Sequence, residues 1–388
     1  MNLLLISVDS LRLDFAPGIS AKVHTPNFCD LARDYHISEH CFSISSATRP
    51  VHTSLFSGLY PFEHGIEGQQ SPAMRQGFAN LFDLCQQDGY AVHGFSQAAD
   101  IFTGLHYARY IAPFPTSPQA ITQLTHTPNP TVLFLHYWDV HTPYGATDGL
   151  AFGEVGRLLA AGRLDLIHER YIAAIERLFE FNISPILAGL DLDKWSVFII
   201  SDHGESWRSD EPYHGQSLRN DVLRVPLYYH IPGSGNPSPG RQLISLIDLF
   251  PTLLAQLGLR HTYRGFARDI HDSDTPGHYL AEIDPGPLAE AAEGSAGPTD
   301  LFPANTFGRQ WALFDPVAKF TYDETTLREE FVSTFSEFPL AAPDDKRSYH
   351  RAYADFKASS NYADADFSQG ADRDILLDRL QKLGYLQG

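Results

Sequence analysis

Acidic side chains and an imidazole directly follow two apolar segments of the chain. The segment 196–201 runs into Asp202 and His203, and the segment 2–8 runs into Asp9. Short apolar runs are typical of buried strands, and an α/β sheet presents polar ligands at the carboxyl ends of its strands. We therefore predict that Asp9, Asp202 and His203 hold a divalent metal ion. A Ser-Asp-His loop is also typical of a capped helix start, which remains the alternative.

A hydroxyl-rich turn in the segment 45–61 precedes a short amphipathic helix that Gly58 terminates. A hydroxyl at a helix N-terminus lies where backbone N–H groups and the helix dipole favour an anion. Ser45, Ser46 and Thr48 are therefore candidates for contact with an anionic substrate. Taken singly, each of them is also interpreted as an ordinary N-cap.

Together these segments resemble the alkaline phosphatase and sulfatase superfamily. In that superfamily the nucleophile lies ten residues before the Gly of a Thr-Gly-Leu/Arg-Tyr-Pro segment, which is Thr48 here, and a later strand ends in Ser-Asp-His-Gly. Thr48–His52 lies on the sulfatase pattern Cys/Ser-x-Pro-x-Arg, but it is closer to the Thr-x-Pro-x-His pattern of nucleotide pyrophosphatases/phosphodiesterases. Because Thr cannot be converted to formylglycine, this departure argues against formylglycine-dependent sulfatase chemistry.

Further segments extend the resemblance through most of the chain. The segment 134–144 is similar to the sulfatase His-x-Pro-His-x-Pro strand end, which directs His141 toward the substrate oxyanion. The segment 213–228 resembles one that carries a substrate Lys in sulfatases and a metal-binding His in phosphodiesterases, and here it offers His214. Two more segments resemble the family's Asp-x-x-Pro-Thr helix and its C-terminal helix, namely 243–254 and 377–386.

The chemistry that this resemblance implies can also be argued from the residues. A phosphate or sulfate ester repels its nucleophile, so the site must concentrate positive charge and deprotonate a poor nucleophile. The expected ligands of the cation are Asp9, Thr48, Asp202 and His203. Beside a divalent cation the Thr48 hydroxyl loses its proton readily, so we expect a covalent phosphothreonine intermediate.

Three further side chains are assigned to the substrate. Arg49 is expected to grip two equatorial oxygens with its guanidinium. His141 and His214 are expected to stabilise the oxyanion, protonate the leaving group or bind a second ion together with Asp139. Asp139-x-His141 departs from the Asp-x-x-x-His spacing of the phosphodiesterases, so one ion is favoured over two. Ser10 replaces the second Asp of the sulfatase pair, which favours Mn²⁺, Mg²⁺ or Zn²⁺ over Ca²⁺.

Other polar residues near these motifs receive supporting roles. His52 is expected inside or directly outside the ligand shell of the metal, and His64 is expected to fix a loop. Arg12 and Asp14 are expected to form an ion pair after the first strand. His136 is given no role, because a bulge would reverse the side of the strand on which it lies.

The composition restricts the class of partner. The formal net charge of −19 argues against a surface for nucleic acid or for an anionic membrane. The expected partner is a small anionic ester, for which local positive charge from the metal and Arg49 has to overcome the overall field of the protein. The longest apolar runs, of about seven residues, are too short to span a bilayer, and we expect no membrane anchor. An apolar strand at residue 2 leaves no room for an export signal, so we expect a cytoplasmic protein. The oligomeric state is not indicated.

Strand-like runs alternate with helical patterns along the chain. The expected strands are 2–8, 91–95, 131–137, 197–201 and 227–231, and the expected helices lie near 80–88, 164–188 and 247–257. This alternation predicts an α/β fold with a mostly parallel central sheet and helices on both faces, as in alkaline phosphatase. We expect a catalytic domain (1–270) and a loop or linker (271–305), and the family resemblance implies a small C-terminal subdomain packed on the catalytic domain (306–388). Within the last, 310–314 and 318–322 are expected to form an antiparallel pair.

Three functions are compatible with these residues. The favoured one is a metal-dependent hydrolase of phosphate mono- or diesters. The second is a sulfatase-like sulfuric ester hydrolase or a phospho-group transferase, because the family's phosphoethanolamine and glycerol-phosphate transferases also use Thr. The third is a non-catalytic binding protein with the same fold, which the presence of Asp9, Thr48, Asp202 and His203 disfavours.

Overall fold

The structure, a computed structural model, describes most of the chain. The described residues are 1–145, 149–150, 152–208, 211–234, 239–240, 242–274, 276–286, 308–342, 345 and 347–362. Among these residues, no helix is both long enough and apolar enough to cross a membrane. The cytoplasmic location stays a prediction, and the helix expected at 377–386 lies outside the described residues.

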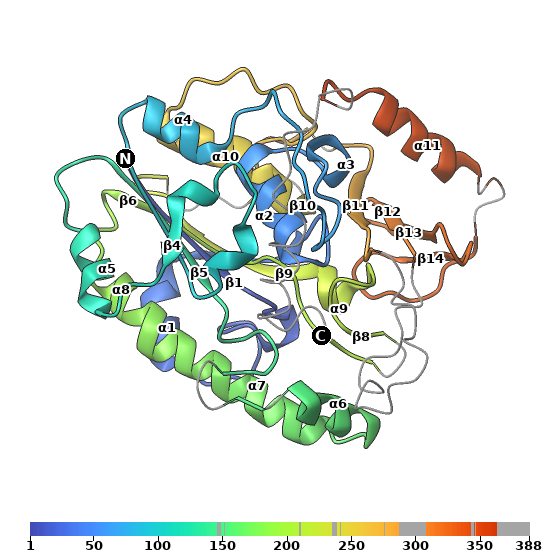
Figure 1. Cartoon of the computed structure of the whole chain (residues 1–388), viewed down its shortest axis with the longest axis horizontal. Coiled ribbons are helices and arrows are strands. Elements are labelled where there is room, and N and C mark those ends of the chain that lie inside the picture. Colours follow the sequence, from blue (N-terminus) through green and yellow to red (C-terminus); the bar gives the residue numbers. More distant parts are fainter. Residues whose placement is uncertain are drawn as a thin grey trace.

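The described part of the chain forms a central eight-stranded sheet in the order β10-β2-β9-β6-β1-β5-β3-β4 (Figure 1). In it, β9 runs antiparallel to both of its neighbours and the other pairs are parallel, so the sheet is mostly parallel, as expected. Its strands are β1 (Asn2–Val8), β2 (His36–Phe42), β3 (Ala91–Ser96), β4 (Ile111–Pro113), β5 (Thr131–Tyr137), β6 (Trp195–Ser201), β9 (Arg224–His230) and β10 (Ile244–Ser245).

Helices cover both faces of this sheet (Figure 1). Successive side chains of β1 point to opposite faces, so Leu3 and Leu5 join one hydrophobic core while Leu4 and Ile6 join another. The first core includes residues of α2, α4 and α10, and the second includes residues of α1, α7 and α8. The helices are α1 (Pro26–Leu31), α2 (Thr48–Ser57), α3 (Pro61–His64), α4 (Leu81–Gln87), α5 (Pro118–Leu124), α6 (Phe152–Ala160), α7 (Leu164–Leu178), α8 (Ser184–Ala188), α9 (Asn220–Leu223), α10 (Leu249–Leu257) and α11 (Arg347–Ala358).

A second, four-stranded antiparallel sheet lies beside the main sheet, on the side of α3 and α9 (Figure 1). It consists of β11 (Tyr279–Ile283), β12 (Gln310–Phe314), β13 (Ala318–Asp323) and β14 (Glu329–Ser333). The expected pair of 310–314 with 318–322 is confirmed. The segment expected as a loop or linker, 271–305, contains a buried strand, β11, because its residues 279–283 pair with β12. The domain boundaries themselves stay a prediction.

A short antiparallel ribbon, β7 (Ser206–Trp207) and β8 (Pro212–Tyr213), follows β6 directly. In its register Ser206 lies opposite Tyr213, so the residue before β7 and the residue after β8 come out side by side. The ribbon therefore begins and ends where the end of β6 presents its polar residues.

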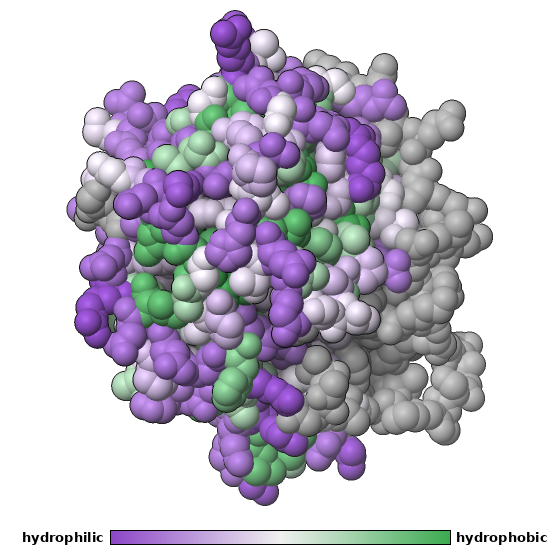
Figure 2. Space-filling model, turned by 90° about the vertical axis from the view of Figure 1, so that its left-hand side faces the viewer, coloured by the Kyte–Doolittle hydropathy of each residue, from purple (hydrophilic) through white to green (hydrophobic). Residues whose placement is uncertain are grey.

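The strands expected from the sequence are confirmed, with ends that differ by a few residues. One central strand, β2, was not expected, because His36–Phe42 carries polar residues and a bulge interrupts its pairing with β9. On the face shown in Figure 2, hydrophilic residues predominate and the hydrophobic ones are scattered among them. That face therefore has the character of an ordinary solvated surface.

Candidate active site

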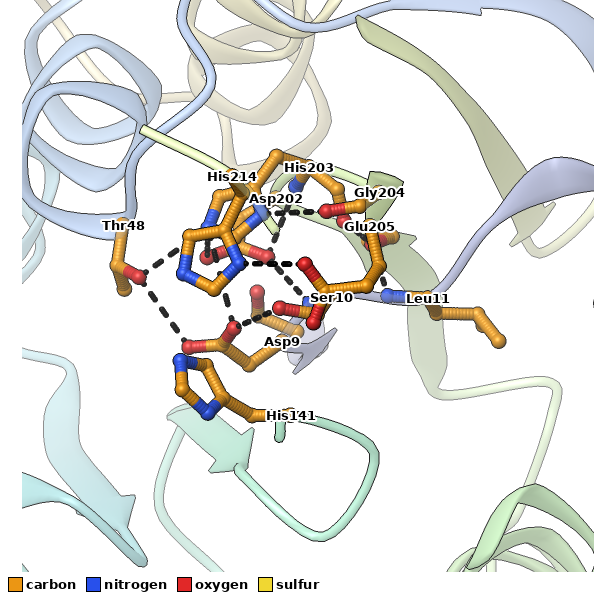
Figure 3. Close-up of polar contacts among 12 residues, drawn as sticks. Asp9, Ser10, Leu11, Thr48, His141, Asp202, His203, Gly204, Glu205 and His214 are labelled. Carbon is orange, nitrogen blue, oxygen red and sulfur yellow. Dashed lines mark hydrogen bonds and ion pairs between the residues drawn. The ribbon is translucent and has the colours of Figure 1, made fainter. Parts of the chain in front are cut away.

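The end of β1 and the end of β6 bring two carboxylates and an imidazole together, because these strands are adjacent and Val8 pairs with Ser201. The ligand atoms that Asp9, Asp202 and His203 offer all lie within 4.8 Å of one another, and the three side chains are fully buried. The Nε2 atom of His203 lies 3.8 Å from Oδ1 of Asp9 and 3.6 Å from Oδ2 of Asp202. The structure thus places three of the four expected ligands in one cluster (Figure 3).

Local hydrogen bonds fix each member of this cluster. The backbone N–H groups of Ser10 and His203 donate to Oδ1 of Asp202 over 3.2 and 2.8 Å. The Ser10 hydroxyl donates to Asp9 over 2.8 Å, and the left-handed backbone of Ser10 (φ 61°) makes this turn. The ring Nδ1 of His203 donates to the carbonyl of Gly204 over 2.9 Å, because a carbonyl can only accept. Nε2 of His203 therefore carries the lone pair, directed at the carboxylates.

Glycine is required after His203 for a packing reason. A Cβ atom at Gly204 would lie 2.0 Å from the backbone oxygen of Asp221, which no side chain can tolerate. The N–H of Gly204 donates to the carbonyl of Val222 over 2.8 Å. The close approach of these two backbones thus holds the loop that carries Asp202 and His203.

The electrostatics of the cluster call for a cation. Burial, and then the charge of Asp9, raise the pKa of Asp202 well above its usual range. Burial also opposes ionisation of Asp9, but the neighbouring His141, His136 and His203 hold its pKa well below the usual range. The second oxygen of Asp202, Oδ2, is buried without a hydrogen-bond donor. A buried acceptor without a partner, next to a second carboxylate and an imidazole lone pair, fits a divalent cation.

Thr48 lies in the first turn of α2, where its fully buried hydroxyl faces the cluster (Figure 3). Its Oγ1 is 3.2 Å from Oδ2 of Asp9 and 3.3 Å from Nε2 of His203. The helix ends as expected at Gly58, whose φ of 71° closes the last turn. The structure therefore brings the expected nucleophile to the expected ligands, and the N-terminus of α2 points at the same place.

The guanidinium of Arg49 binds backbone oxygens of neighbouring loops. It is fully buried, and Nη1 donates to the carbonyls of Ile101 (2.6 Å) and Thr103 (2.9 Å). Nη2 donates to the carbonyl of Ser71 over 3.1 Å, and burial lowers the pKa of Arg49 to about 10. Because backbone oxygens take these donors, we propose that Arg49 ties two loops to α2 instead of gripping two substrate oxygens, as the sequence predicted.

His52 lies beside the ligands and does not point a free nitrogen at them. Nδ1 lies 2.8 Å from the carbonyl of Thr48 and must donate to it, and Nε2 lies 3.0 Å from the Ser7 hydroxyl. His52 Nδ1 is 3.8 Å from Oδ2 of Asp202. We therefore assign His52 to the layer directly behind the ligands.

His136 is a site residue that the sequence left without a role. The pairing of β1 with β5 is continuous up to Tyr137, so no bulge intervenes, and His136 lies opposite Ser7. Its Nε2 is 3.4 Å from Oδ2 of Asp9, and its Nδ1 is 2.8 Å from the Ser96 hydroxyl. The alternation of side chains along the strand contained this information, because without a bulge the side chain of His136 lies on the same face of the sheet as that of Ser7.

His141 and His214 close the cluster from two loops, and their ring centroids lie 4.8 Å apart (Figure 3). Nδ1 of His141 donates to the carbonyl of Thr142 over 2.6 Å, and Nδ1 of His214 is 3.0 Å from Oε1 of Glu205. Burial lowers the pKa of His141 to about 4. Burial acts in the same direction on His214, but Glu205 outweighs it and raises the pKa of His214. The pair thus offers a neutral ring and a more basic ring.

The second-metal set suggested by the sequence is not assembled. Asp139 Oδ2 accepts from the Gln97 side chain over 2.7 Å. Within the described residues, the groups with metal-binding geometry are Asp9, Asp202 and His203, and His52, His136 and Asp202. Neither group includes Asp139, His141 or His214, and the number of ions stays a prediction.

The roles expected for His64, Arg12 and Asp14 agree with the structure, and Gln69 is a further residue near α2 that the sequence did not indicate. His64 bonds the Ser54 hydroxyl (2.9 Å) and the N–H of Ile66, which fixes its loop, and Arg12 pairs with Asp14 at 2.8 Å. Gln69 was not expected: its Oε1 accepts from the N–H of Arg49 (3.2 Å), and its Nε2 is buried without a partner. Gln69 lies in no motif of the sequence, and only the fold of the segment after α2 brings it back to this helix.

Comparison with known proteins agrees with this geometry. A family model described as Sulfatase matches residues 1–259. No curated protein matches the chain.

The fold is also that of solved structures, which are distant in sequence. A phosphonate monoester hydrolase of Agrobacterium radiobacter superposes with a TM-score of 0.61 at 19% identity, covering 92% of this chain and 95% of that one. A 2-O GAG sulfatase gives 0.65 at 15% identity, with coverage of 97% and 96%. The C-terminal periplasmic domain of EcEptC from Escherichia coli, in complex with Zn, gives 0.55 at 12% identity, with coverage of 73% and 89%.

Proposed function

Because this chain belongs to the sulfatase family, we propose that it is a metal-dependent hydrolase of phosphate mono- or diesters with Thr48 as its nucleophile. The observation that carries the proposal is the position of the Thr48 hydroxyl, at 3.2 Å from Asp9 and 3.3 Å from His203. A threonine cannot become formylglycine, so its hydroxyl must act directly. A hydroxyl nucleophile that forms a covalent intermediate suits phosphoryl transfer.

The ligands of the cation in this proposal are Asp9, Thr48, Asp202 and His203. When bound, a divalent cation lowers the pKa of a neighbouring hydroxyl and neutralises charge on a phosphoryl oxygen. The choice among Mn²⁺, Mg²⁺, Zn²⁺ and Ca²⁺ follows from the donor set of carboxylate oxygens, a hydroxyl and an imidazole, which favours the first three.

The chain's own groups around Thr48 recognise the rest of the anion. The first turn of α2 places the positive end of the helix dipole beside the nucleophile. The buried Nε2 amide of Gln69, whose Oε1 accepts from the N–H of Arg49 in this turn, is a donor in the same region. These groups take the place that the sequence analysis gave to Arg49.

His141 and His214 act on the leaving side in this proposal. Each ring donates through Nδ1 to a fixed acceptor, so each presents Nε2 to the space between the loops. His214, whose pKa is raised, holds a proton at Nε2 that it can donate to the leaving oxygen or to the oxyanion. His141, whose pKa is lowered to about 4, is the neutral partner of the pair.

A substrate panel tests the proposal. Metal-loaded protein should be assayed with an aryl phosphate, an aryl phosphodiester, an aryl phosphonate monoester and an aryl sulfate. We expect a phosphorus ester to be cleaved with the highest kcat/KM. The sulfate ester is the second candidate, because the matching family model is described as Sulfatase and a similar solved structure is that of a sulfatase. A tenfold preference for sulfate, about 1.4 kcal/mol in barrier, would reverse the order.

The number of ions is tested with His214. If His214 contacts the substrate, His214→Ala should keep the metal content of the wild type while kcat falls by about 10²- to 10³-fold, the cost of one transition-state donor. If His214 binds a second ion, the variant should lose about one ion per chain. We expect the first result, and two ions per chain in the wild type would contradict it.

A further inference from the structure

Glu205 is a buried carboxylate that connects the loops around the proposed site. Its side chain is fully buried. Oε1 accepts from Nδ1 of His214 over 3.0 Å, and Oε2 accepts from the Thr142 hydroxyl over 2.7 Å. The Tyr144 hydroxyl lies 3.4 Å from Oε2. One side chain thus joins the end of β6 to the loop after β5 and to the loop after β8.

The backbone places Glu205 and His214 opposite each other. Glu205 directly precedes β7 and His214 directly follows β8, and the register pairs Ser206 with Tyr213. The backbone carbonyl of Glu205 is held separately, by Nη1 of Arg12 over 2.6 Å. The carboxylate is therefore not needed to close the ribbon or to anchor the main chain at this point.

The bond from His214 to Glu205 holds a proton on Nδ1 of the ring, whether or not Nε2 is also protonated. An ionised carboxylate can only accept, so Nδ1 of His214 carries a proton and Nε2 is presented to the site. The bond from Thr142 acts on the other ring, because the carbonyl of Thr142 accepts from Nδ1 of His141 over 2.6 Å. Figure 3 shows both rings beside the Asp9 carboxylate, and Glu205 next to His214 on the side away from Thr48.

The charge of Glu205 has a specific partner. Among the described residues, its carboxylate forms an ion pair with Nδ1 of His214, 3.0 Å away. A buried carboxylate costs more to desolvate than the amide of the same shape, but both of its oxygens accept hydrogen bonds here, whereas a glutamine offers only one accepting oxygen. A carboxylate at this position is therefore explained by the ring that it orients.

We propose that Glu205 is a positioning residue that holds Nε2 of His214 toward the leaving group and, through Thr142, also steadies the loop of His141. The proposal rests on the proposed function, since it takes His214 to face the ester. A carboxylate behind a histidine sets both the tautomer and the direction of the ring, and loss of such partners elsewhere costs about 10- to 100-fold.

The first test is a kinetic comparison of Glu205→Gln, Glu205→Ala, His214→Ala and the double variant that combines Glu205→Ala with His214→Ala. We expect kcat to fall by about 10- to 100-fold in Glu205→Ala with KM changed little, and Glu205→Gln to recover part of the loss because it keeps the shape. The fall should be larger for an alkyl or phenyl ester than for a nitrophenyl ester, which needs no protonation of its leaving group. The double variant should be no slower than His214→Ala alone.

Glu63→Gln is the matched control for the loss of a buried glutamate. Glu63 is also fully buried, but it accepts from the N–H of Tyr60 and from Ser360, away from the site. This control should keep the wild-type dependence on the leaving group. If Glu205→Ala and His214→Ala slow the reaction additively and equally for all leaving groups, Glu205 is structural and the proposal is wrong.

A second readout does not depend on turnover. In protein labelled with ¹⁵N-histidine and loaded with Mg²⁺, the Nδ1–H signal of His214, assigned by its loss in His214→Ala, should be present in the wild type and in Glu63→Gln. In Glu205→Ala it should be lost or shift to the Nε2–H tautomer. An unchanged Nδ1–H signal in Glu205→Ala overturns the proposal. If the wild type cleaves no ester, the proposed function fails, and this spectrum still decides whether Glu205 sets the ring.

Discussion

Replacement of Asp202 by asparagine separates the metal site from the fold. The amide oxygen of the introduced side chain can still accept from the N–H groups of Ser10 and His203, so the loop keeps both hydrogen bonds. The amide nitrogen replaces the Oδ2 that has no donor in the wild type, and it puts an N–H group where a cation would be. We therefore expect Asp202→Asn to fold, to lose its metal and to lose turnover.

The size of the effect on stability follows from the burial of the two acids. Without metal, the wild type holds Asp202 against Asp9, whose charge helps to raise the pKa of Asp202. The metal-free variant removes this repulsion and should be at least as stable as the metal-free wild type. A ligand at 100 times its Kd adds about 2.7 kcal/mol, which for a 388-residue chain shifts Tm by about 3 °C.

Thermal unfolding with and without added metal, combined with metal analysis, measures these quantities. The wild type should gain about 3 °C at 100 times its Kd, whereas Asp202→Asn should gain less than about 1 °C. Asp248→Asn is the control, because Asp248 is a buried acid that accepts from Ser245 and Arg268 away from the site. It should keep the full metal-dependent shift. A normal metal content and full activity in Asp202→Asn would refute the site.

Three further predictions concern single residues. Thr48→Ala should lower kcat/KM for the best phosphorus ester by at least about 10³-fold, whereas Thr48→Ser should keep part of the activity. Equal activity of the wild type and both variants would show that Thr48 is not the nucleophile. Arg49→Lys should lower the free energy of unfolding by several kcal/mol, about 1 to 3 kcal/mol for each buried carbonyl left without a donor, with little change in KM. A large rise in KM at unchanged stability would instead show that Arg49 binds the substrate oxygens. Burial raises the pKa of Glu63 in the folded protein to about 7. The stabilisation that its bound proton provides is therefore complete below the pKa of about 4.5 in the unfolded chain, and it is lost as the pH rises through 7. Denaturant titrations should therefore show that the stability of the wild type relative to Glu63→Gln falls by about 2 to 3 kcal/mol from pH 5 to pH 8, and a constant difference would contradict the shift.

The clustering of the proposed ligands and the proposed nucleophile could be predicted because local sequence determines where they lie. Asp9, Asp202 and His203 each follow a short apolar strand, and adjacent strands of a parallel sheet end at one edge. Thr48 was identified by the family resemblance, which places the nucleophile ten residues before Gly58, and the end of α2 confirms Gly58 as a helix terminus. In each case the relevant information lies within about one strand or one helix of the residue concerned.

The orientation of the other side chains depends on contacts between distant segments. Arg49 follows Thr48 directly, and only the approach of the loops near residues 71 and 101–103 shows that carbonyls accept from both Nη atoms of its guanidinium. Gln69 and Glu205 acquire their roles in the same way, from α2 and from the β7–β8 ribbon. A sequence pattern that shows which residues are polar does not show which partner reaches them first.

The stereochemical course at phosphorus tests the central claim most directly. A chiral aryl phosphorothioate diester should be hydrolysed in ¹⁸O-labelled water by metal-loaded wild-type protein, and the configuration of the product determined. Attack by Thr48 followed by attack of water comprises two in-line displacements, so the account predicts net retention of configuration. Inversion would show that water attacks the ester directly, and it would contradict a covalent phosphothreonine intermediate.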